Sequence, residues 1–372
     1  MGLTALQAQG EGLGATAVAE YRGATTAARF SDPDTEFAKL RKECGVYDLG
    51  YRAKLSLTGA DRVRWLNGMV TNNIRDLASG QGVYAFLLNP QGHILGDLYA
   101  YNRGDSIVVD TDRSQVEKML ATFDHYIIMD DVEVTNLSDS ITALGIAGPK
   151  SRQVLTAAGI VIPDSNSLQI FEAKCTCDCE CTQCTAVRGE DAAYETYELW
   201  LAPGDVRKTW EALAAQGATP VGSEALEIHR IASGIPLYGV DIRERDLPQE
   251  TEQARALNFN KGCYIGQEIV ERIRSRGAVH RKFSGFLSDA ARPLAAGTKI
   301  VAGEKDVGEI TSVAFLRFPE TEKTVALGYV RRELGNPGRE VMIGGGNATV
   351  VPLPVPEALL SPDRSAPVAR PA

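Results

Sequence analysis

The sequence predicts an α+β protein whose sheets are antiparallel, followed by a small β-barrel. Predicted strands over residues 83–88 and 94–101 flank a turn at 89–92, so neighbouring strands form hairpins instead of alternating strictly with helices. Strands and helices recur in a similar order in both halves of the first 280 residues, which favours two related modules. From residue 282 to residue 354, short strands separated by glycine and proline dominate, as in a small barrel or sandwich.

The first module is predicted to begin with a helix near Ser31. A cap residue precedes Pro33, which suits the first turn, and Asp34 adds negative charge near the positive end of the helix. Further strands are predicted at residues 54–58, 83–88, 94–101, 106–110 and 131–136, and further helices from residue 59 and over 115–126.

The second module is predicted to contain a helix over residues 203–216, because Val206, Trp210 and Leu213 recur at helical spacing. Its other elements are strands at 141–147 and 194–201 and helices at 150–158 and 223–233. Barrel strands are predicted at 283–287, 299–301, 306–315, 325–330, 341–343 and 349–353. We expect a flexible segment over 1–30, the two modules over 31–280, the barrel over 281–355 and a disordered tail over 356–372.

Composition and charge narrow the class of protein. The 372 residues are enough for two or three domains, and 44% hydrophobic with 23% charged residues is ordinary for a globular protein. A net charge of −9 argues against a general nucleic-acid binder or a protein of anionic membranes. Neither a long apolar run nor a signal-peptide pattern occurs, so we expect a cytoplasmic protein without a membrane span. In a reducing compartment the seven cysteines would not form a disulfide framework.

The most distinctive stretch runs from residue 260 to residue 272. Ile265, Ile269 and Ile273 recur at helical spacing. This spacing predicts a loop followed by a helix, with Cys263 in the first helical turn. A thiol there would lie near the positive end of the helix dipole and close to Lys261, and both favour the thiolate. The alternative is a small buried Gly262-Cys263 pair at a close approach of two backbones.

The motif Lys-Gly-Cys-Tyr-x-Gly-Gln-Glu at 261–268 resembles the signature of the folate-binding YgfZ family. That family includes iron–sulfur cluster assembly and repair factors and is related to the glycine-cleavage T-protein, an aminomethyltransferase. The resemblance covers about residues 31–355 and includes segments 45–49, 57–61, 147–149, 238–242 and 308–312. It implies two interleaved α+β modules and a C-terminal barrel, arranged as a three-lobed ring around a central folate cavity. T-proteins generally lack the cysteine, so Cys263 indicates the iron–sulfur branch.

The resemblance implies tetrahydrofolate or a derivative as the cofactor. The edge of a pterin presents adjacent N–H donors that one carboxylate can accept in a bidentate manner. Glu198 matches the T-protein glutamate that binds this edge, although Thr196 replaces the usual glycine; the alternative is a solvent-facing strand residue. Arg230 matches an arginine associated with folate binding, and Tyr238 matches a nearby aromatic residue. On residue type alone, Arg230 is one exposed arginine on a helix.

Asp97 decides whether one-carbon transfer is expected. T-proteins carry two consecutive aspartates after Gly-x-Ile-Leu, whereas here the pair is Gly96-Asp97. If the functional aspartate aligns with Gly96, transfer is lost, and if it aligns with Asp97, transfer is retained. A buried acid beside an amine can act as a base or an electrostatic stabiliser; the alternative is a surface acid beside a turn. Tyr84 and Tyr101 can line the cavity or pack in the core.

Five cysteines fall within ten residues: Cys175, Cys177, Cys179, Cys181 and Cys184. This stretch is not part of the family pattern. In an extended strand alternate thiols lie about 7 Å apart, so a single metal ion would require the segment to curl. The two alternatives are a soft-metal or cluster site and a variable hairpin insertion.

Two functions follow from these patterns. The first is a folate-binding accessory protein for iron–sulfur cluster assembly or repair, with iron–sulfur proteins or the assembly machinery as partners. The alternative is an aminomethyltransferase that moves a one-carbon unit to tetrahydrofolate. A related folate-dependent demethylase or oxidase domain is disfavoured because no flavin fingerprint occurs. Cys263, Lys261 and Asp97 are the candidate catalytic residues.

Overall fold

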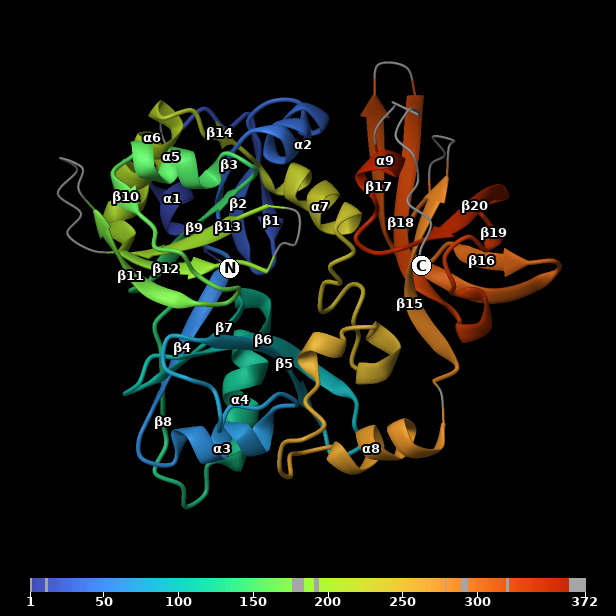
Figure 1. Cartoon of the computed structure of the whole chain (residues 1–372), viewed down its shortest axis with the longest axis horizontal. Helices are drawn as coiled ribbons and strands as arrows, with labels where there is room; N and C mark the ends of the chain where they lie inside the picture. Colours follow the sequence, from blue (N-terminus) through green and yellow to red (C-terminus); the bar gives the residue numbers. More distant parts are fainter. Residues whose placement is uncertain are drawn as a thin grey trace. The chain divides into compact units, whose positions relative to one another are not determined.

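The computed structural model describes residues 2–10, 13–175, 184–190, 194–277, 279–288, 294–318 and 321–360. Two compact units make up the chain (Figure 1). Unit 1 comprises Met1–Leu87, Gly96–Leu226 and Arg255–Ile265, and unit 2 comprises Leu88–Leu95, Glu227–Ala254 and Gly266–Ala372. The predicted α+β class with antiparallel sheets and a C-terminal barrel is confirmed.

Unit 1 contains two sheets whose strands interleave along the chain. In the described part of the chain, a five-stranded sheet has the order β5 (Gly82–Leu88), β6 (Ile94–Asn102), β7 (Ile107–Asp112), β4 (Arg52–Thr58) and β8 (Glu133–Asn136). A seven-stranded sheet has the order β10 (Ile160–Val161), β11 (Ile170–Cys175), β12 (Cys184–Arg188), β13 (Thr196–Leu201), β9 (Thr142–Ala147), β3 (Gly45–Asp48) and β14 (Thr219–Pro220). Because β3 precedes the first sheet in sequence and β9 follows it, the two modules are interleaved, as expected.

The helices of unit 1 are α2 (Pro33–Lys42), α3 (Arg62–Met69), α4 (Val116–Tyr126), α5 (Ser151–Ala157) and α6 (Val206–Ala215). The side chain of Asp32 caps α2 by accepting a hydrogen bond from the Thr35 amide, at 3.1 Å. Helix α6 places Val206, Trp210 and Leu213 in the core, as their spacing predicts.

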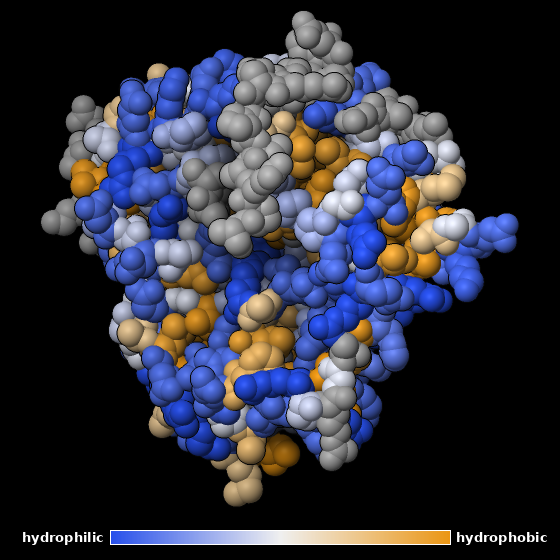
Figure 2. All heavy atoms as spheres, turned by 45° about the vertical axis from the view of Figure 1, so that its right-hand side comes forward, coloured by the Kyte–Doolittle hydropathy of each residue, from blue (hydrophilic) through white to orange (hydrophobic). Residues whose placement is uncertain are grey.

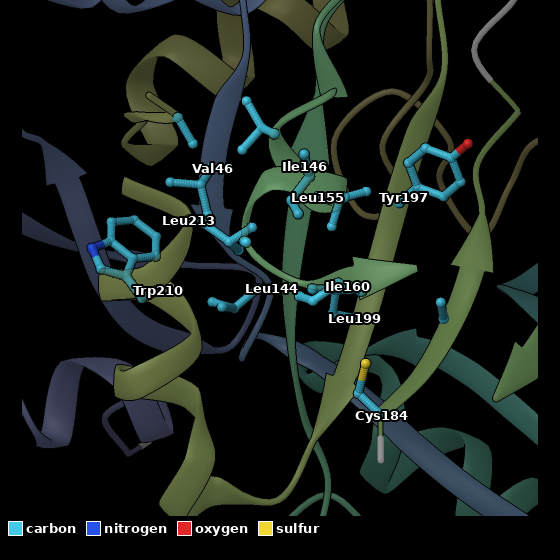
Figure 3. Close-up of a cluster of buried hydrophobic side chains, with 14 of the residues drawn as sticks. Val46, Leu144, Ile146, Leu155, Ile160, Cys184, Tyr197, Leu199, Trp210 and Leu213 are labelled. Atoms are coloured by element: carbon cyan, nitrogen blue, oxygen red, sulfur yellow. The ribbon is translucent and has the colours of Figure 1, made fainter. Parts of the chain in front are cut away.

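The apolar core of unit 1 lies along one face of the seven-stranded sheet. Figure 3 shows Trp210 and Leu213 of α6 and Leu155 of α5 beside Val46, Leu144, Ile146 and Leu199 of the sheet. Cys184 also belongs to this cluster. One face of the sheet therefore packs against α5 and α6. Because side chains alternate along a strand, the opposite face of β13 and its neighbours is available for other contacts.

The described residues of the segment 1–30 differ from the flexible segment that we expected. They contain α1 (Ala5–Ala8) and the antiparallel pair β1 (Ala17–Tyr21) and β2 (Ala24–Arg29). Leu6 and Ala24 are buried, and the Thr26 hydroxyl donates a hydrogen bond to the buried Asp48 carboxylate at 2.9 Å. These tertiary contacts order a stretch whose local composition is rich in alanine, glycine and threonine.

Unit 2 contains the predicted barrel. Its closed order is β15 (Arg281–Ser288), β18 (Thr321–Arg331), β17 (Lys305–Phe318), β16 (Lys299–Ala302), β19 (Glu340–Ile343) and β20 (Gly346–Val351). Phe286, Ile300, Ile310 and Val330 are among the residues that fill its interior. Helix α7 (Ser223–Ala232) passes from unit 1 into unit 2, and α8 (Gln267–Arg276) and α9 (Glu357–Leu360) belong to unit 2. Most of the predicted tail, residues 361–372, lies outside the described residues.

Hydrophilic side chains cover most of the face in Figure 2, with smaller hydrophobic patches between them. Within the described ranges, no helix combines the length and the apolar character needed to cross a membrane. The predicted ring of lobes around a folate cavity stays a prediction.

Candidate functional site

One face of the five-stranded sheet carries the chemistry predicted for β6. Strand alternation directs Asp97, Tyr99 and Tyr101 to the same face, and Tyr84 of β5 joins them. The Tyr84 hydroxyl donates to Asp97 Oδ2 at 2.7 Å, and Gln115 Nε2 donates to Asp97 Oδ1 at 2.7 Å. Burial, followed by the negative charge of Asp112, raises the pKa of Asp97. Asp97 is therefore a half-buried acid that two hydrogen bonds orient, not a surface acid beside a turn.

Gly96 points away from this group of side chains. A Cβ atom at position 96 would lie 3.0 Å from Gln115 Oε1 and 3.7 Å from Met119 Cε. An acid at that position would face α4, whereas Asp97 contacts Tyr84 directly. Of the two positions, only 97 places a carboxylate among the tyrosines.

The aromatic rings form a continuous wall from β5 to β13. The Tyr84 and Tyr99 centroids are 5.0 Å apart, Tyr99 stacks on Tyr101 at 6.3 Å, and Tyr101 meets the edge of Trp200 at 5.4 Å. Arg255 covers part of this wall, since its guanidinium carbon lies 4.2 Å from the Tyr84 centroid. Tyr99 keeps some exposed surface, while Tyr84 and Tyr101 are buried.

A network of buried charges continues the same face on β4 and β7. Lys54 pairs in register with Asp110, and Arg52 with Asp112. Arg52 donates through Nε to Asp110 at 3.0 Å and through Nη1 to Asp112 at 2.6 Å. Lys54 Nζ lies 3.1 Å from Asp110 Oδ1. Buried charges are costly unless they are paired, and clusters of buried charges that interact are typical of functional sites.

Glu198 of β13 faces this network from the other sheet. The indole N–H of Trp200 donates to Glu198 Oε2 at 3.0 Å, and Glu198 as a whole is half-buried. Burial, followed by the charge of Asp110, raises the pKa of Glu198, whereas Lys54 and Arg52 lower it. Trp200 therefore holds the carboxylate of a half-buried Glu198 by a hydrogen bond. Glu198, Asp97, Tyr84 and Tyr101 all belong to the same polar and aromatic region of unit 1.

Arg230 and Tyr238 belong to unit 2, and both are already engaged. Arg230 is 4% exposed and donates to Glu227, to the Ile235 carbonyl, to Asp241 at 2.6 Å and to Ser312 at 2.9 Å. These contacts use all five N–H donors of a guanidinium group. The Tyr238 hydroxyl donates to the Leu95 carbonyl at 2.5 Å.

The same contacts give the segments 238–242 and 308–312 a structural role. Asp241 is fully buried and accepts hydrogen bonds from Thr311, from Ser312 at 2.7 Å and from the Leu237 amide at 2.9 Å. Together with Arg230, it joins α7 and the 237–242 segment to barrel strand β17 within unit 2. A direct folate contact by Arg230 would require breaking this network.

The loop around Cys263 differs from the prediction. Helix α8 begins at Gln267, after Gly266 with a φ of 81°, so the placement of Cys263 in the first helical turn is wrong. The alternative of a buried pair is also wrong, because both Gly262 and Cys263 are exposed. Lys261 Nζ is buried and donates to the carbonyls of Asn67, Val70 and Asn72 at 2.6, 2.5 and 2.7 Å.

Lys261 therefore caps the end of α3 and does not pair with the thiol. The three carbonyls lie in or just after the last turn of α3, where the helix leaves acceptors without partners. Burial, followed by the charge of Arg75, lowers the pKa of Lys261 to about 7. The lysine fixes the loop that presents Cys263 to solvent.

The cysteine-rich stretch connects two paired strands. β11 and β12 are antiparallel, with Ala173 opposite Cys184, and Cys184 is buried in the apolar core. This pairing agrees with the hairpin alternative. Cys177, Cys179, Cys181 and the side chain of Cys175 lie outside the described residues. Among the residues that the structure describes, no group of three or more histidine, cysteine, aspartate or glutamate side chains could hold a metal ion.

Two surface hollows of about 410 and 640 Å³ lie in unit 2. Arg245, Arg281 and Tyr329 line the first, and His280 and Arg332 line the second. No residue of the predicted site lines either hollow, so the chemistry of the site does not coincide with them.

Several residues of the site were missed by sequence reasoning: Arg52, Lys54, Tyr99, Asp110, Asp112, Gln115, Trp200 and Arg255. The signal for the charged members was present, since charged residues at every second position of otherwise apolar strands share one face. Arg255 carried no such signal, because it lies in a loop distant in sequence from Tyr84.

Comparisons with known proteins agree on one family. The family model described as "GCVT N-terminal domain" matches residues 6–261, and the "Glycine cleavage T-protein C-terminal barrel domain" matches residues 281–355. An aminomethyltransferase of Halothermothrix orenii is 28% identical over 334 residues, covering 87% of this chain and 90% of the relative. That of Rubrobacter xylanophilus is 27% identical over 357 residues, covering 94% and 93%. The crystal structure of aminomethyltransferase T from Bartonella henselae has the same fold, with a TM-score of 0.83, 22% identity and coverage of 95% and 97%.

Proposed function

The chain belongs to the glycine-cleavage T-protein family, and we propose that it is a folate-dependent one-carbon transferase of the aminomethyltransferase type. The observation that carries this proposal is the half-buried Asp97, which Tyr84 and Gln115 hold by hydrogen bonds beside an aromatic wall. The names of the curated relatives support the same activity. The specific membership in the YgfZ branch, which the Cys263 motif suggests, becomes the second candidate below.

The residues of unit 1 fit a reduced folate by their chemistry. Tetrahydrofolate would supply the nitrogen atoms that accept a one-carbon unit. Glu198 would accept the adjacent N–H donors of the pterin edge, and Tyr84, Tyr99 and Tyr101 would provide aromatic surface for the rings. The raised pKa of Asp97 brings this acid closer to neutral pH, where a group that holds or releases a proton acts most efficiently.

Replacing Asp97 tests this role. With an aminomethyl group on a lipoylated carrier protein and tetrahydrofolate as acceptor, we expect the wild type to form methylene-tetrahydrofolate. Asp97→Asn keeps the shape but removes the ionisable group, so kcat should fall by about 100-fold or more. Asp124→Asn, at an exposed position of α4, is the matched control and should keep wild-type turnover. Equal turnover of Asp97→Asn and wild type would exclude Asp97 as the acid or base.

A second candidate function follows from the exposure of Cys263. We propose as the alternative that the protein binds folate and assists iron–sulfur cluster assembly or repair, with the thiol in contact with a partner or a cluster. In this case the wild type would bind tetrahydrofolate without turnover. Cys44 and Cys263 are free thiols, which supports placing either function in a reducing compartment such as the cytoplasm.

Complementation separates the two candidates. If the alternative holds, a strain lacking the gene should lose activity of its iron–sulfur enzymes, and Cys263→Ser should fail to restore it. Cys44→Ser, at a buried position, is a control for a thiol in the core, provided that its thermal midpoint shows a folded protein. Full restoration by Cys263→Ser would remove the thiol from the proposed function.

A further inference from the structure

Lys54 is a buried cation that the chemistry described so far does not use. Its side chain is 1% exposed on β4, and Nζ lies 3.1 Å from Asp110 Oδ1. Within the described ranges, no group accepts a hydrogen bond of good geometry from this Nζ. The same nitrogen lies 4.7 Å from the centre of a Trp200 ring. A buried ammonium over an indole face makes a cation–π contact that solvent does not screen.

The Trp200 indole connects Lys54 to Glu198. Its Nε1–H donates to Glu198 Oε2 at 3.0 Å, while its ring faces Lys54. A cation over the ring draws electron density from it, and the indole N–H then becomes a better hydrogen-bond donor. Lys54 therefore acts on the Glu198 carboxylate in two ways, by its own charge and through the indole.

The charges around Glu198 make Lys54 distinctive. Arg52 also faces Glu198, but its Nε and Nη1 already donate to Asp110 and Asp112. Asp110 on β7 opposes ionisation of Glu198, as burial does. Glu198 also interacts electrostatically with Tyr51 and Tyr101, and burial raises the pKa of both tyrosines, so they stay neutral. Lys54 is the cation in this set that no carboxylate binds through a hydrogen bond of good geometry.

We propose that Lys54 is a positioning residue that keeps Glu198 ionised and oriented by Trp200, so that this wall of the site recognises a heterocycle with two adjacent N–H donors. An ionised carboxylate only accepts hydrogen bonds, whereas a protonated one presents a donor and would match a different edge. Lys54 thus selects the protonation state that a 2-amino-pyrimidinone edge requires. The identity of this ligand rests on the proposed function, but the effect of Lys54 on Glu198 does not.

The effect on Glu198 can be measured without any ligand. In protein with ¹³C-labelled glutamate carboxyl groups, Glu198→Gln assigns the Glu198 signal, and the pH midpoint of that signal reports its ionisation. The indole N–H signal of Trp200, assigned with Trp200→Phe, should move with the same midpoint. We expect Lys54→Met to raise this midpoint by about one pH unit or more, because it removes an opposite charge nearby.

Control variants separate the effect of the Lys54 charge on Glu198 from a general effect of removing a lysine or of losing the fold. Lys305→Met removes an exposed lysine on β17 and should leave the midpoint unchanged. Lys54→Met leaves Asp110 paired with Arg52, so the protein should still fold. If it does not fold, Asp110→Asn and the double variant Lys54→Met/Asp110→Asn supply the same comparison. A higher midpoint in the double variant than in Asp110→Asn supports the proposal, and equal midpoints overturn it.

Binding of tetrahydrofolate gives a second readout. Titration calorimetry of the wild type and Lys54→Met should show an affinity that is about ten-fold weaker in the variant at pH values below both Glu198 midpoints, since a midpoint raised by about one pH unit corresponds to that factor. The two affinities should converge as pH rises above both midpoints. An affinity loss that does not recover with pH would contradict a role through Glu198. If the wild type binds no folate at all, the proposed function fails, while the ligand-free midpoints still decide the role of Lys54.

Discussion

Asp97 and Gly96 illustrate how much depends on a single position. Alternation along β6 directs Asp97 to the tyrosines and the side of Gly96 to Gln115 and Met119. The sequence Gly96-Asp97 by itself does not show which of the two positions carries the functional acid. Orientation relative to Tyr84, which only the paired strands define, favours position 97.

At the residue scale, Asp97 should make stability depend on pH. Its folded-state pKa is raised, so between the unfolded and folded values the folded protein holds a proton that the unfolded chain has lost. Stability from this group is complete below the unfolded pKa and is lost as pH rises through the folded pKa. Asp97→Asn should therefore gain stability relative to wild type as pH rises from about 4, near the unfolded pKa of an aspartate, to 8.

Urea midpoints at several pH values measure this effect. Tryptophan fluorescence reports unit 1, because Trp65, Trp200 and Trp210 all belong to it. Asp124→Asn is the control and should follow the wild type at every pH. A constant difference between Asp97→Asn and wild type across this range would show that the carboxyl titrates alike in both states.

At the scale of the element, Lys261 stabilises the end of α3. Its Nζ serves three carbonyls that the helix cannot satisfy itself. Lys261→Met removes these donors from a buried position, and we expect a loss of about 1–3 kcal/mol in the free energy of unfolding. Lys42→Met, at an exposed position of α2, is the control. An unchanged urea midpoint for Lys261→Met would leave the lysine available for chemistry at Cys263.

Element positions followed the sequence where the local pattern was strong. The strands predicted at 83–88 and 94–101 correspond to β5 and β6, and the helix predicted at 203–216 corresponds to η2 (Pro203–Asp205) followed by α6. The pair β1–β2 was missed, whereas β11–β12 agrees with the hairpin alternative for the cysteine-rich stretch. Most residues of β1 and β2 are small or polar, and partners far along the chain order them, such as Asp48 for Thr26.

At the scale of the whole molecule, the chain returns to a sheet that it has already begun. β3 opens the seven-stranded sheet, β4 to β8 form the other sheet, and β9 then pairs with β3. Glu198 and Trp200 on β13 consequently face Lys54 and Tyr101, which lie about a hundred or more residues earlier in the chain. No local pattern predicts this juxtaposition.

The sequence alone determined the α+β class and the barrel, because periodicity and turns are local properties. The resemblance to T-proteins supplied the candidates Asp97, Glu198, Tyr84 and Tyr101. Tertiary structure decided which candidates share a site. It buried Arg230 in a saturated network, assigned Lys261 to the end of α3 and surrounded Glu198 with charges from β4 and β7. Strand pairing decides which side chains are buried and which charges lie beside them. Burial and neighbouring charges together set the pKa of each acid.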